Sequence, residues 1–284
     1  SAWKMDSMAL LRYNGRKAKE RMMGMLRCPN CHGELKREER TFRCQNGHSF
    51  DVARQGYVNL LVNARKETGD NKAMVKARTA FLEQGHCRCL RHALRGIVQE
   101  LPVRLIADCG CGEGYYAQAA AEAGKEIFAF DMSKYALMKG ARRHPDIHAF
   151  AASIYDLPLE DECVDMVMSI FAPFAQTEFL RVLKPGGYVL KVGPAPDHLL
   201  ELKQVLYEQV YENHEETKSD PGMALCFTRT VRDQITVEGQ EMIHALFQMT
   251  PYYYRSPQAG VSRLNALAQL QTRISFRMEL YQKQ

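Results

Sequence analysis

The chain has 284 residues, 46% of them hydrophobic, which is enough for one large domain with a hydrophobic core and a small additional unit. Its formal net charge of +5 permits a polyanionic partner without requiring one, and no run approaches the roughly 18 apolar residues that span a bilayer. Nine cysteines, an odd number without a regular framework, argue against a disulfide scaffold, so we expect a cytoplasmic protein.

The pattern predicts four successive segments. Residues 1–25 form a basic N-terminal extension, and residues 26–61, rich in Cys, Gly and Asn, form a small metal-held module. Residues 62–100 change from a polar linker into apolar positions at helical spacing. Residues 101–284 form the large domain.

The small module contains a metal-ligand pattern. Cys28 and Cys31 are followed after twelve residues by Cys44 and after three more by His48. Paired short spacings allow two turns to present four ligands tetrahedrally to Zn²⁺, leaving no open position, so the metal would be structural. The alternatives are ordinary thiols or a redox pair at Cys28 and Cys31, and His32 is the main alternative to His48 as fourth ligand.

In the large domain, short apolar runs alternate with helical stretches. This alternation predicts βαβ units, and therefore an α/β fold with a mostly parallel sheet. A helix is expected over Asp197–Asn213 and a β-prone piece at Tyr252–Tyr254. The other strands are expected at Val103–Ala107, Ile127–Phe130, Ile147–Ala151, Val164–Phe171, Tyr188–Val192 and Thr272–Met278.

A glycine-rich turn follows the first of these strands. Asp108 begins an Asp-x-Gly-x-Gly-x-Gly sequence, in which Gly110 and Gly112 let the backbone pass close to a ligand. The next strand ends in Asp131, where a Rossmann-type fold places the carboxylate that binds ribose hydroxyls. A dinucleotide enzyme is the usual alternative, but its motif is G-x-G-x-x-G.

The glycine loop resembles the signature loop of class I Rossmann-like methyltransferases, which bind S-adenosylmethionine. Residues 152–159 resemble the segment beside the adenine in that class, and residues 182–190 resemble the turn into its fifth strand. The resemblance implies that Gly110, Gly112 and Glu113 lie against the methionine end of the cofactor, Asp131 against the ribose and Ser153 beside the adenine. Asp108 is predicted to belong to the same cofactor site.

From Leu26 to the C-terminus, the chain resembles the bacterial 23S ribosomal RNA guanine-N1 methyltransferases that act on a hairpin in domain II. The amino-acid sequence of the linker is more similar to that of the Gram-positive branch of this family. The resemblance implies that His198 lies near the cofactor and that the protein is a homodimer; Cys87 stands where relatives commonly have Tyr. The shared segments include Cys28–Cys31, Gln45–Asp51, Gly56–Leu61, Gly69–Asp70, Ala77–Arg78, Phe81–His86, Cys109–Tyr116, Phe171–Pro173, His198–Leu202 and Met249–Pro251.

Methylating N1 of guanine requires loss of the ring proton and an unpaired or flipped base. Phe171 or Phe174 could stack on that base, although either could equally be a core aromatic residue. Asp156 and Asp165 are candidate proton acceptors but are more readily explained as structural, so the catalytic residue stays unassigned.

Basic residues of the module and linker supply a field for binding RNA phosphates. They are Arg27, Lys36, Arg37, Arg40, Arg43, Arg54, Arg65, Lys66, Lys72, Lys76 and Arg78. Two other functions remain open: a small-molecule methyltransferase with the same turn before strand five, and a non-catalytic, zinc-dependent RNA-binding protein.

Overall fold

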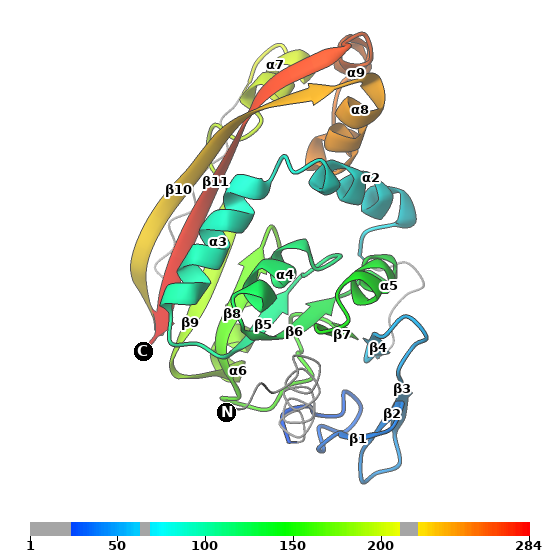
Figure 1. Ribbon diagram of the computed structural model, residues 1–284, viewed down its shortest axis with the longest axis vertical. Coiled ribbons are helices and arrows are strands. Elements are labelled where there is room, and N and C mark those ends of the chain that lie inside the picture. Colours follow the sequence, from blue (N-terminus) through cyan, green and yellow to red (C-terminus); the bar gives the residue numbers. More distant parts are fainter. Residues whose placement is uncertain (1–23, 63–68, 211–220) are drawn as a thin grey trace, which may run out of the picture.

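The computed structural model describes residues 24–62, 69–210 and 221–284. Within them the chain forms a three-stranded antiparallel sheet and an eight-stranded, mostly parallel sheet, which confirms the predicted α/β fold (Figure 1). Residues 1–23 of the expected basic extension, together with Arg65 and Lys66, lie outside the described part. Among the described residues, no helix is both long and apolar enough to cross a bilayer.

The large sheet has the strand order β10-β11-β9-β8-β5-β6-β7-β4. Neighbouring strands from β4 to β9 run parallel, with β5 at the centre between β6 and β8. A crevice opens at the carboxyl ends of strands where the chain order reverses, here between β5 and β8. These six strands are β4 (Val58–Asn59), β5 (Leu105–Cys109), β6 (Glu126–Asp131), β7 (His148–Ala151), β8 (Val164–Ile170) and β9 (Leu183–Pro194).

Two long antiparallel strands complete the sheet. β11 (Gln269–Lys283) pairs with β9 on one side and with β10 (Met223–Glu238) on the other, and together they form the curved ribbon along one side of the molecule (Figure 1). β10 was not predicted from the sequence. The prediction of a β-prone piece at Tyr252–Tyr254 was wrong. These residues lie in the 3-10 helix η1 (Pro251–Tyr254), where proline occupies the first turn.

Helices cover both faces of the sheet. One face packs in a hydrophobic core against α3 (Arg88–Glu100), α4 (Tyr115–Glu122), α7 (Leu200–Leu206), α8 (Gln240–Gln248) and α9 (Gln258–Asn265). α5 (Lys134–Arg143) packs on the same face, against Ala149 and Ala151 of β7, and α6 (Gln176–Val182) packs in a second core on the other face. α7 is shorter than the helix expected over residues 197–213, of which residues 211–213 lie outside the described part.

The small sheet consists of β1 (Lys36–Glu38), β2 (Thr41–Arg43) and β3 (Ser49–Asp51). The small sheet packs into the same hydrophobic core as α6. Phe42 is buried in this core, with its ring 6.3 Å from that of Phe150 on β7. Leu26 forms a bridge with Leu159 of the large domain. β4, inside the segment expected to be a separate module, pairs with β7 and becomes an edge strand of the large sheet.

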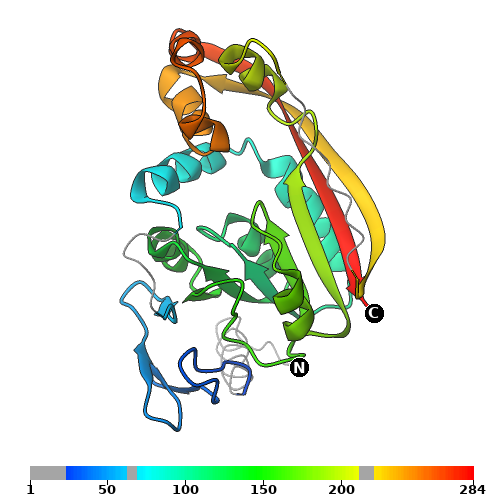
Figure 2. The ribbon, with the colours of Figure 1, turned by 180° about the vertical axis from the view of Figure 1, so that it is seen from behind.

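The linker leads into α2 (Lys72–Glu83), which crosses above the carboxyl edge of the sheet and contacts α8 and α5 (Figure 2). The helix begins at Asn71, whose side chain accepts a hydrogen bond of 3.0 Å from the Met74 amide. The apolar spacing that predicted helices in residues 62–100 therefore corresponds to α2 and α3. The segment boundaries themselves remain a prediction.

Candidate functional site

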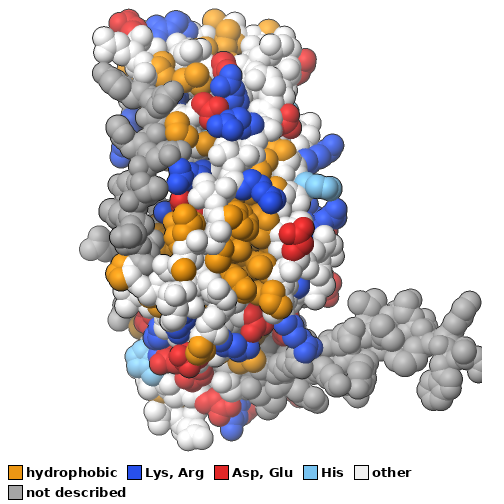
Figure 3. All heavy atoms as spheres, turned by 90° about the vertical axis from the view of Figure 1, so that its left-hand side faces the viewer, with side chains coloured by type: hydrophobic (Ala, Val, Ile, Leu, Met, Phe, Trp, Pro, Cys, Tyr) orange, Lys and Arg blue, Asp and Glu red, His pale blue; other side chains and the backbone are white. Residues whose placement is uncertain are grey.

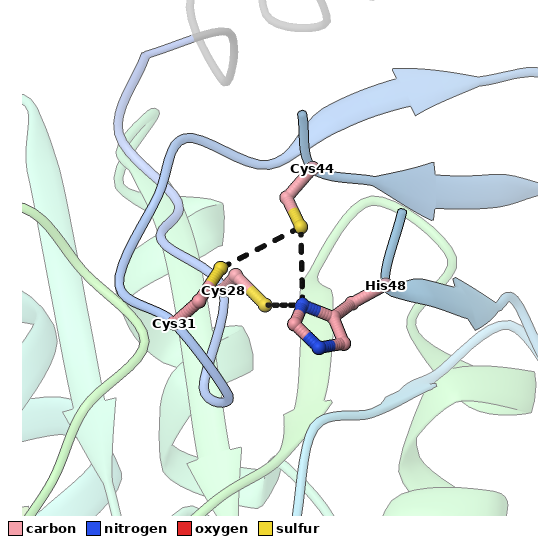
Figure 4. A group of neighbouring side chains, drawn as sticks. All are labelled: Cys28, Cys31, Cys44 and His48. Carbon is pink, nitrogen blue, oxygen red and sulfur yellow. Dashed lines mark hydrogen bonds between the residues drawn. The ribbon is translucent and has the colours of Figure 1, made fainter. Parts of the chain in front are cut away.

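Three sulfur atoms and one imidazole nitrogen converge at the edge of the small sheet (Figure 4). The ligand atoms of Cys28, Cys31, Cys44 and His48 all lie within 4.8 Å of one another. The Cys31 and Cys44 sulfurs are 3.7 Å apart, and His48 Nδ1 lies 3.6 and 3.4 Å from the sulfurs of Cys28 and Cys44. Tetrahedral zinc with ordinary bond lengths requires S···S and S···N separations of about 3.8 and 3.6 Å. The donor set therefore fits Zn²⁺.

Two turns bring these ligands together. The Cys28 carbonyl accepts a bond from the His32 amide, and the Cys44 carbonyl accepts one from Gly47, whose φ of +82° favours glycine. The neighbouring amide of Gly33 lowers the pKa of the Cys31 thiol to about 6, whereas burial raises that of Cys28 to about 11. His32 is exposed and lies outside the cluster of four.

The glycine loop lies at the carboxyl end of β5 and lines a cavity of about 280 Å³. Gly110 has φ +84°, and a Cβ placed there would lie 2.5 Å from the Cβ of Ala172, which follows β8. Only glycine lets these two segments approach so closely. The missing side chain at Gly110 therefore serves the packing of the loop against the segment after β8, and its role toward a ligand stays a prediction.

Asp131 lines this cavity. Its Oδ2 accepts a hydrogen bond of 2.8 Å from the Gly112 amide, and its Oδ1 accepts one of 2.7 Å from Ser133. Burial raises the pKa of Asp131, and these two amides oppose that rise. Asp108 is fully buried behind the loop; burial and the nearby Asp131 carboxylate raise its pKa to about 7. Asp108 is not among the residues that line the cavity.

Two other predicted cofactor residues have different positions. Glu113 lines the cavity and is buried, with its Oε1 accepting a bond of 3.2 Å from the Thr79 hydroxyl. The Ser153 hydroxyl instead accepts a bond of 3.2 Å from the Tyr155 amide, within a turn of its own. Ile154 and Tyr155 line the cavity in its place.

The end of the linker forms another wall of the cavity, which sequence reasoning missed. Ser133 Oγ donates a bond of 2.7 Å to the Asp70 carbonyl, and the Asp70 carboxylate pairs with Arg78 on α2. Arg78 was expected to bind RNA phosphates, yet it lines the cavity beside the glycine loop. The shared Gly69–Asp70 and Ala77–Arg78 segments were the signal that could have identified it.

A second cavity, of about 520 Å³, adjoins the first. The two cavities share five lining residues from α2, α4 and the segment after β8, and among its described lining residues the second contains no carboxylate. The shared residues are Arg78, Leu82, Tyr116, Phe171 and Ala172. The two cavities therefore meet at these five residues.

Phe171 is the aromatic residue at this junction. Its side chain is 48% exposed, its φ is +53°, and its ring lies 6.4 Å from that of Tyr116 and 5.6 Å from that of Phe276. Phe174 lines neither cavity; its ring packs 5.4 Å from that of Phe179 on α6. Of the two aromatic candidates, only Phe171 can reach an acceptor base.

His198 lines the second cavity and not the first. Burial, followed by the charge of Lys203, lowers the pKa of its imidazole to about 4, so the ring is neutral near pH 7. Its Nδ1 accepts a bond of 3.1 Å from the Ser275 amide, which leaves the proton on Nε2. His198 can therefore donate a hydrogen bond but cannot readily accept a proton.

The two acidic residues considered as proton acceptors lie elsewhere. Asp165 accepts bonds of 2.9 Å from the amides of Arg104 and Leu105 at the amino end of β5, and it pairs with Lys184. Asp156 forms an exposed ion pair with Arg27. Both are structural in this fold.

Comparison with known proteins agrees with this geometry. A family model described as "RlmA, N-terminal" matches residues 26–68 and one described as "Methyltransferase domain" matches residues 107–190. The protein is thus a class I, S-adenosylmethionine-dependent methyltransferase that carries a structural zinc ribbon. The 23S rRNA (guanine(748)-N(1))-methyltransferase of Streptomyces fradiae is 39% identical over 217 residues, covering 74% of this chain and 78% of the relative. The chain belongs to the 23S rRNA (guanine-N1)-methyltransferase family.

Other relatives show how far the similarity extends. YxjB of Bacillus subtilis (strain 168), by name a candidate member of the same class, is 32% identical over 260 residues, covering 86% of this chain and 92% of the relative. A malonyl-[acyl-carrier protein] O-methyltransferase of Pectobacterium atrosepticum is 32% identical over only 35% of this chain and 42% of its own length. This relative, whose name gives a malonyl group on a carrier protein as its substrate, therefore matches over a much smaller part of the chain.

Loss of one zinc ligand should release the metal. Cys44→Ser removes a thiolate that tetrahedral coordination requires, so zinc measured by mass spectrometry should fall from about one ion per chain to near zero. Thermal unfolding should begin at a lower temperature, because the ribbon shares a core with the large sheet. Exposed Cys226→Ser is the control, and a full zinc content in Cys44→Ser would contradict the site.

Stability should depend on the ionisation of Asp108. Its folded pKa of about 7 exceeds the unfolded value of about 3.9, so the folded state binds the proton more tightly and stability falls as pH rises from about 4 to about 7. Asp108→Asn cannot ionise, so urea unfolding should show a gain of a few kcal/mol over the wild type at pH 8 that largely disappears at about pH 4. Asp146→Asn, at an exposed position, is the control and should show no such difference; a pH-independent effect of Asp108→Asn would refute the assignment.

Proposed function

We propose that the protein transfers a methyl group from S-adenosylmethionine to N1 of a guanine in a hairpin of 23S ribosomal RNA. The observation that carries this proposal is the pair of adjoining cavities, one at the glycine loop and one lined by aromatic side chains. The family supplies the substrate class, and the name of the Streptomyces fradiae relative makes the guanine equivalent to position 748 the first target to test.

The cofactor residues follow from the first cavity. Gly110, Gly112 and Glu113 would lie along the methionine end, with the Arg78 guanidinium beside its carboxylate, and Asp131 would accept bonds from the ribose hydroxyls. The carboxylate can do this because each of its oxygens has spare acceptor capacity after binding one amide. We propose that Asp108 supports the glycine loop from its buried position and that Ser153 belongs to the turn beside the adenine.

The second cavity would hold the extruded guanine. When bound, S-adenosylmethionine supplies an electrophilic methyl group; the protein positions N1 against it and excludes water. Phe171 offers a face for stacking, and the Nε2 hydrogen of His198 can be donated to a base oxygen that gains charge as N1 loses its proton. No carboxylate is among the described lining residues of this cavity, so we assign no protein group as the acceptor of the N1 proton.

We infer that Cys28, Cys31, Cys44 and His48 hold a structural Zn²⁺ and that the ribbon they stabilise contacts the hairpin. The ribbon carries exposed Lys36, Arg40 and Arg43 on or next to β1 and β2. These cations create a positive electrostatic potential that attracts RNA phosphates, at a distance from the methyl-transfer site. None of the nine cysteines forms a disulfide, which fits the reducing cytoplasm in which ribosomal RNA is modified.

Methylation of an RNA hairpin tests the activity. Purified protein, cofactor and a domain II hairpin transcript should give a primer-extension stop at one guanine, because N1 methylation blocks the Watson–Crick edge. Asp131→Ala should weaken cofactor binding, measured by calorimetry, about 10- to 100-fold. Asp146→Ala, an exposed acidic residue, is the control.

Three results would contradict the proposal. Methylation at another guanine atom, absence of any stop with the wild-type protein, or unchanged cofactor binding by Asp131→Ala would each exclude part of it. The Cys44→Ser variant should still bind cofactor but methylate the hairpin poorly. Equal methylation by that variant would exclude a role for the ribbon in holding RNA.

We further infer that the protein forms a homodimer through the outer edge of β10. Among the described strands, β10 pairs only with β11, and its Leu225 is 52% exposed. Figure 3 shows hydrophobic side chains gathered on the side of the molecule that β10 borders, with Lys and Arg around them. Long open edges of this kind readily pair with another chain.

Light scattering tests the dimer. The wild-type protein should have twice the 32.4 kDa mass of one chain, and Leu225→Glu should shift it toward the mass of one chain, because a buried carboxylate at the edge is costly. Leu225→Met is the matched control. A wild-type protein with the mass of one chain would exclude the dimer.

A further inference from the structure

A basic groove lies between α2 and α5, outside both cavities. It encloses about 410 Å³, and five of its eight lining residues are Lys or Arg, with no acidic residue among them. Figures 1 and 2 both show the two helices as neighbours beside the carboxyl edge of the sheet. The five cations are Lys72, Lys76, Lys139, Arg142 and Arg143.

The charges in this groove are poorly neutralised by the protein itself. Among the described residues, Arg143 is the only one of the five with an ion-pair partner, Glu83. Burial lowers the pKa of Lys139, and the like charge of Arg143 lowers it further. Five crowded cations with only Glu83 paired to one of them, and with Glu83 and Glu113 near Lys139, keep a net positive charge that attracts a polyanion.

An exposed aromatic residue stands among these cations. Tyr135, near the start of α5, lines the groove with 49% of its surface exposed. A large aromatic side chain open to solvent can stack on an unpaired base, while nearby Lys and Arg bind the phosphates. An exposed aromatic residue among cations is typical of surfaces that bind a single nucleic-acid strand. It is unusual for a surface that has no binding partner.

The groove is joined to the methyl-transfer junction through α2. Lys72 and Lys76 face the groove, whereas Arg78 and Leu82 line both cavities. Lys76 and Leu82 are separated by a helical rise of about 9 Å, a distance that one to three nucleotides can span. α5 is fixed at the same site, because Ser133 at its start bonds to Asp70.

We propose that the α2–α5 groove binds the phosphodiester backbone of the RNA strand flanking the flipped guanine, with Tyr135 stacking on a neighbouring base. This inference rests on the proposed RNA substrate. It adds a binding surface on the methyltransferase domain to that of the zinc ribbon. The groove would fix the strand while the base occupies the second cavity.

The test compares two charge-matched double variants of the full chain. Lys139→Gln with Arg142→Gln removes two groove cations, and Arg95→Gln with Arg104→Gln removes two cations on α3 and before β5 that form no ion pair with the described residues. Binding of the domain II hairpin is measured by fluorescence anisotropy at several salt concentrations. The groove variant should bind about 10-fold or more weakly, and its salt slope should fall by about 1.4 to 1.8, as for two lost phosphate contacts.

A second pair of variants isolates stacking from charge. Tyr135→Ala should weaken binding about 5- to 100-fold, whereas Tyr135→Phe should retain it, because only the ring is required. In every groove variant, the cofactor dissociation constant and the rate at saturating RNA should match those of the wild type. A merely structural role would alter these two quantities as well.

The outcomes separate this inference from the proposed function. If the wild-type protein methylates the hairpin but the groove variant has the affinity and salt slope of the control, the groove inference is overturned. The groove inference is also overturned if the groove variant keeps its RNA affinity but loses affinity for an acidic peptide, the alternative ligand of a basic groove. If the wild-type protein neither binds nor methylates the hairpin, the proposed function itself fails.

Discussion

The carboxylate of Asp131 is the contact on which the site depends. It joins the glycine loop after β5 to the start of α5 after β6, through the amides of Gly112 and Ser133. Ser133 in turn bonds to Asp70, so the linker and α2 are drawn over the same edge of the sheet. One buried carboxylate therefore positions three segments around the cofactor cavity, and its charge is tolerated because backbone amides surround it.

This arrangement explains why the donor and acceptor cavities meet where they do. Gly110 packs against Ala172, and the next residue back, Phe171, is held in the left-handed region with its amide bonded to the Val192 carbonyl. The strained backbone turns an aromatic ring out of the sheet and toward the junction. Strain of this kind is held only where surrounding contacts fix the geometry, and it is concentrated at functional sites.

Features with a strong local signal could be predicted from the sequence. The glycine loop and Asp131 each follow an apolar strand, and parallel strands bring their carboxyl ends to one edge, so their proximity followed from the fold class. The spacing of the three cysteines and His48 predicted the zinc cluster. The position of Arg78 could not be predicted from local sequence, because it depends on the path of the linker back over the sheet. The spacing of apolar residues carries no information about that path.

The C-terminal part was predicted least well, for two physical reasons. β10 is an edge strand, largely open to solvent, so polar residues such as Arg232 and Asp233 interrupt any apolar alternation. The three tyrosines of η1 have high strand propensity, but Pro251 fixes the first turn of a 3-10 helix and Tyr252 packs against Tyr207. His198 was placed by family resemblance alone, and the structure puts it on the acceptor side.

The placement of β4 has a consequence for the protein in a cell short of metal. This two-residue strand covers the outer edge of β7, and it follows directly from the zinc ribbon. A chain that failed to acquire its ion would leave a row of unsatisfied backbone groups along β7, and such rows recruit other chains. Zinc supply would then govern whether newly made protein aggregates, quite apart from whether it can recognise RNA.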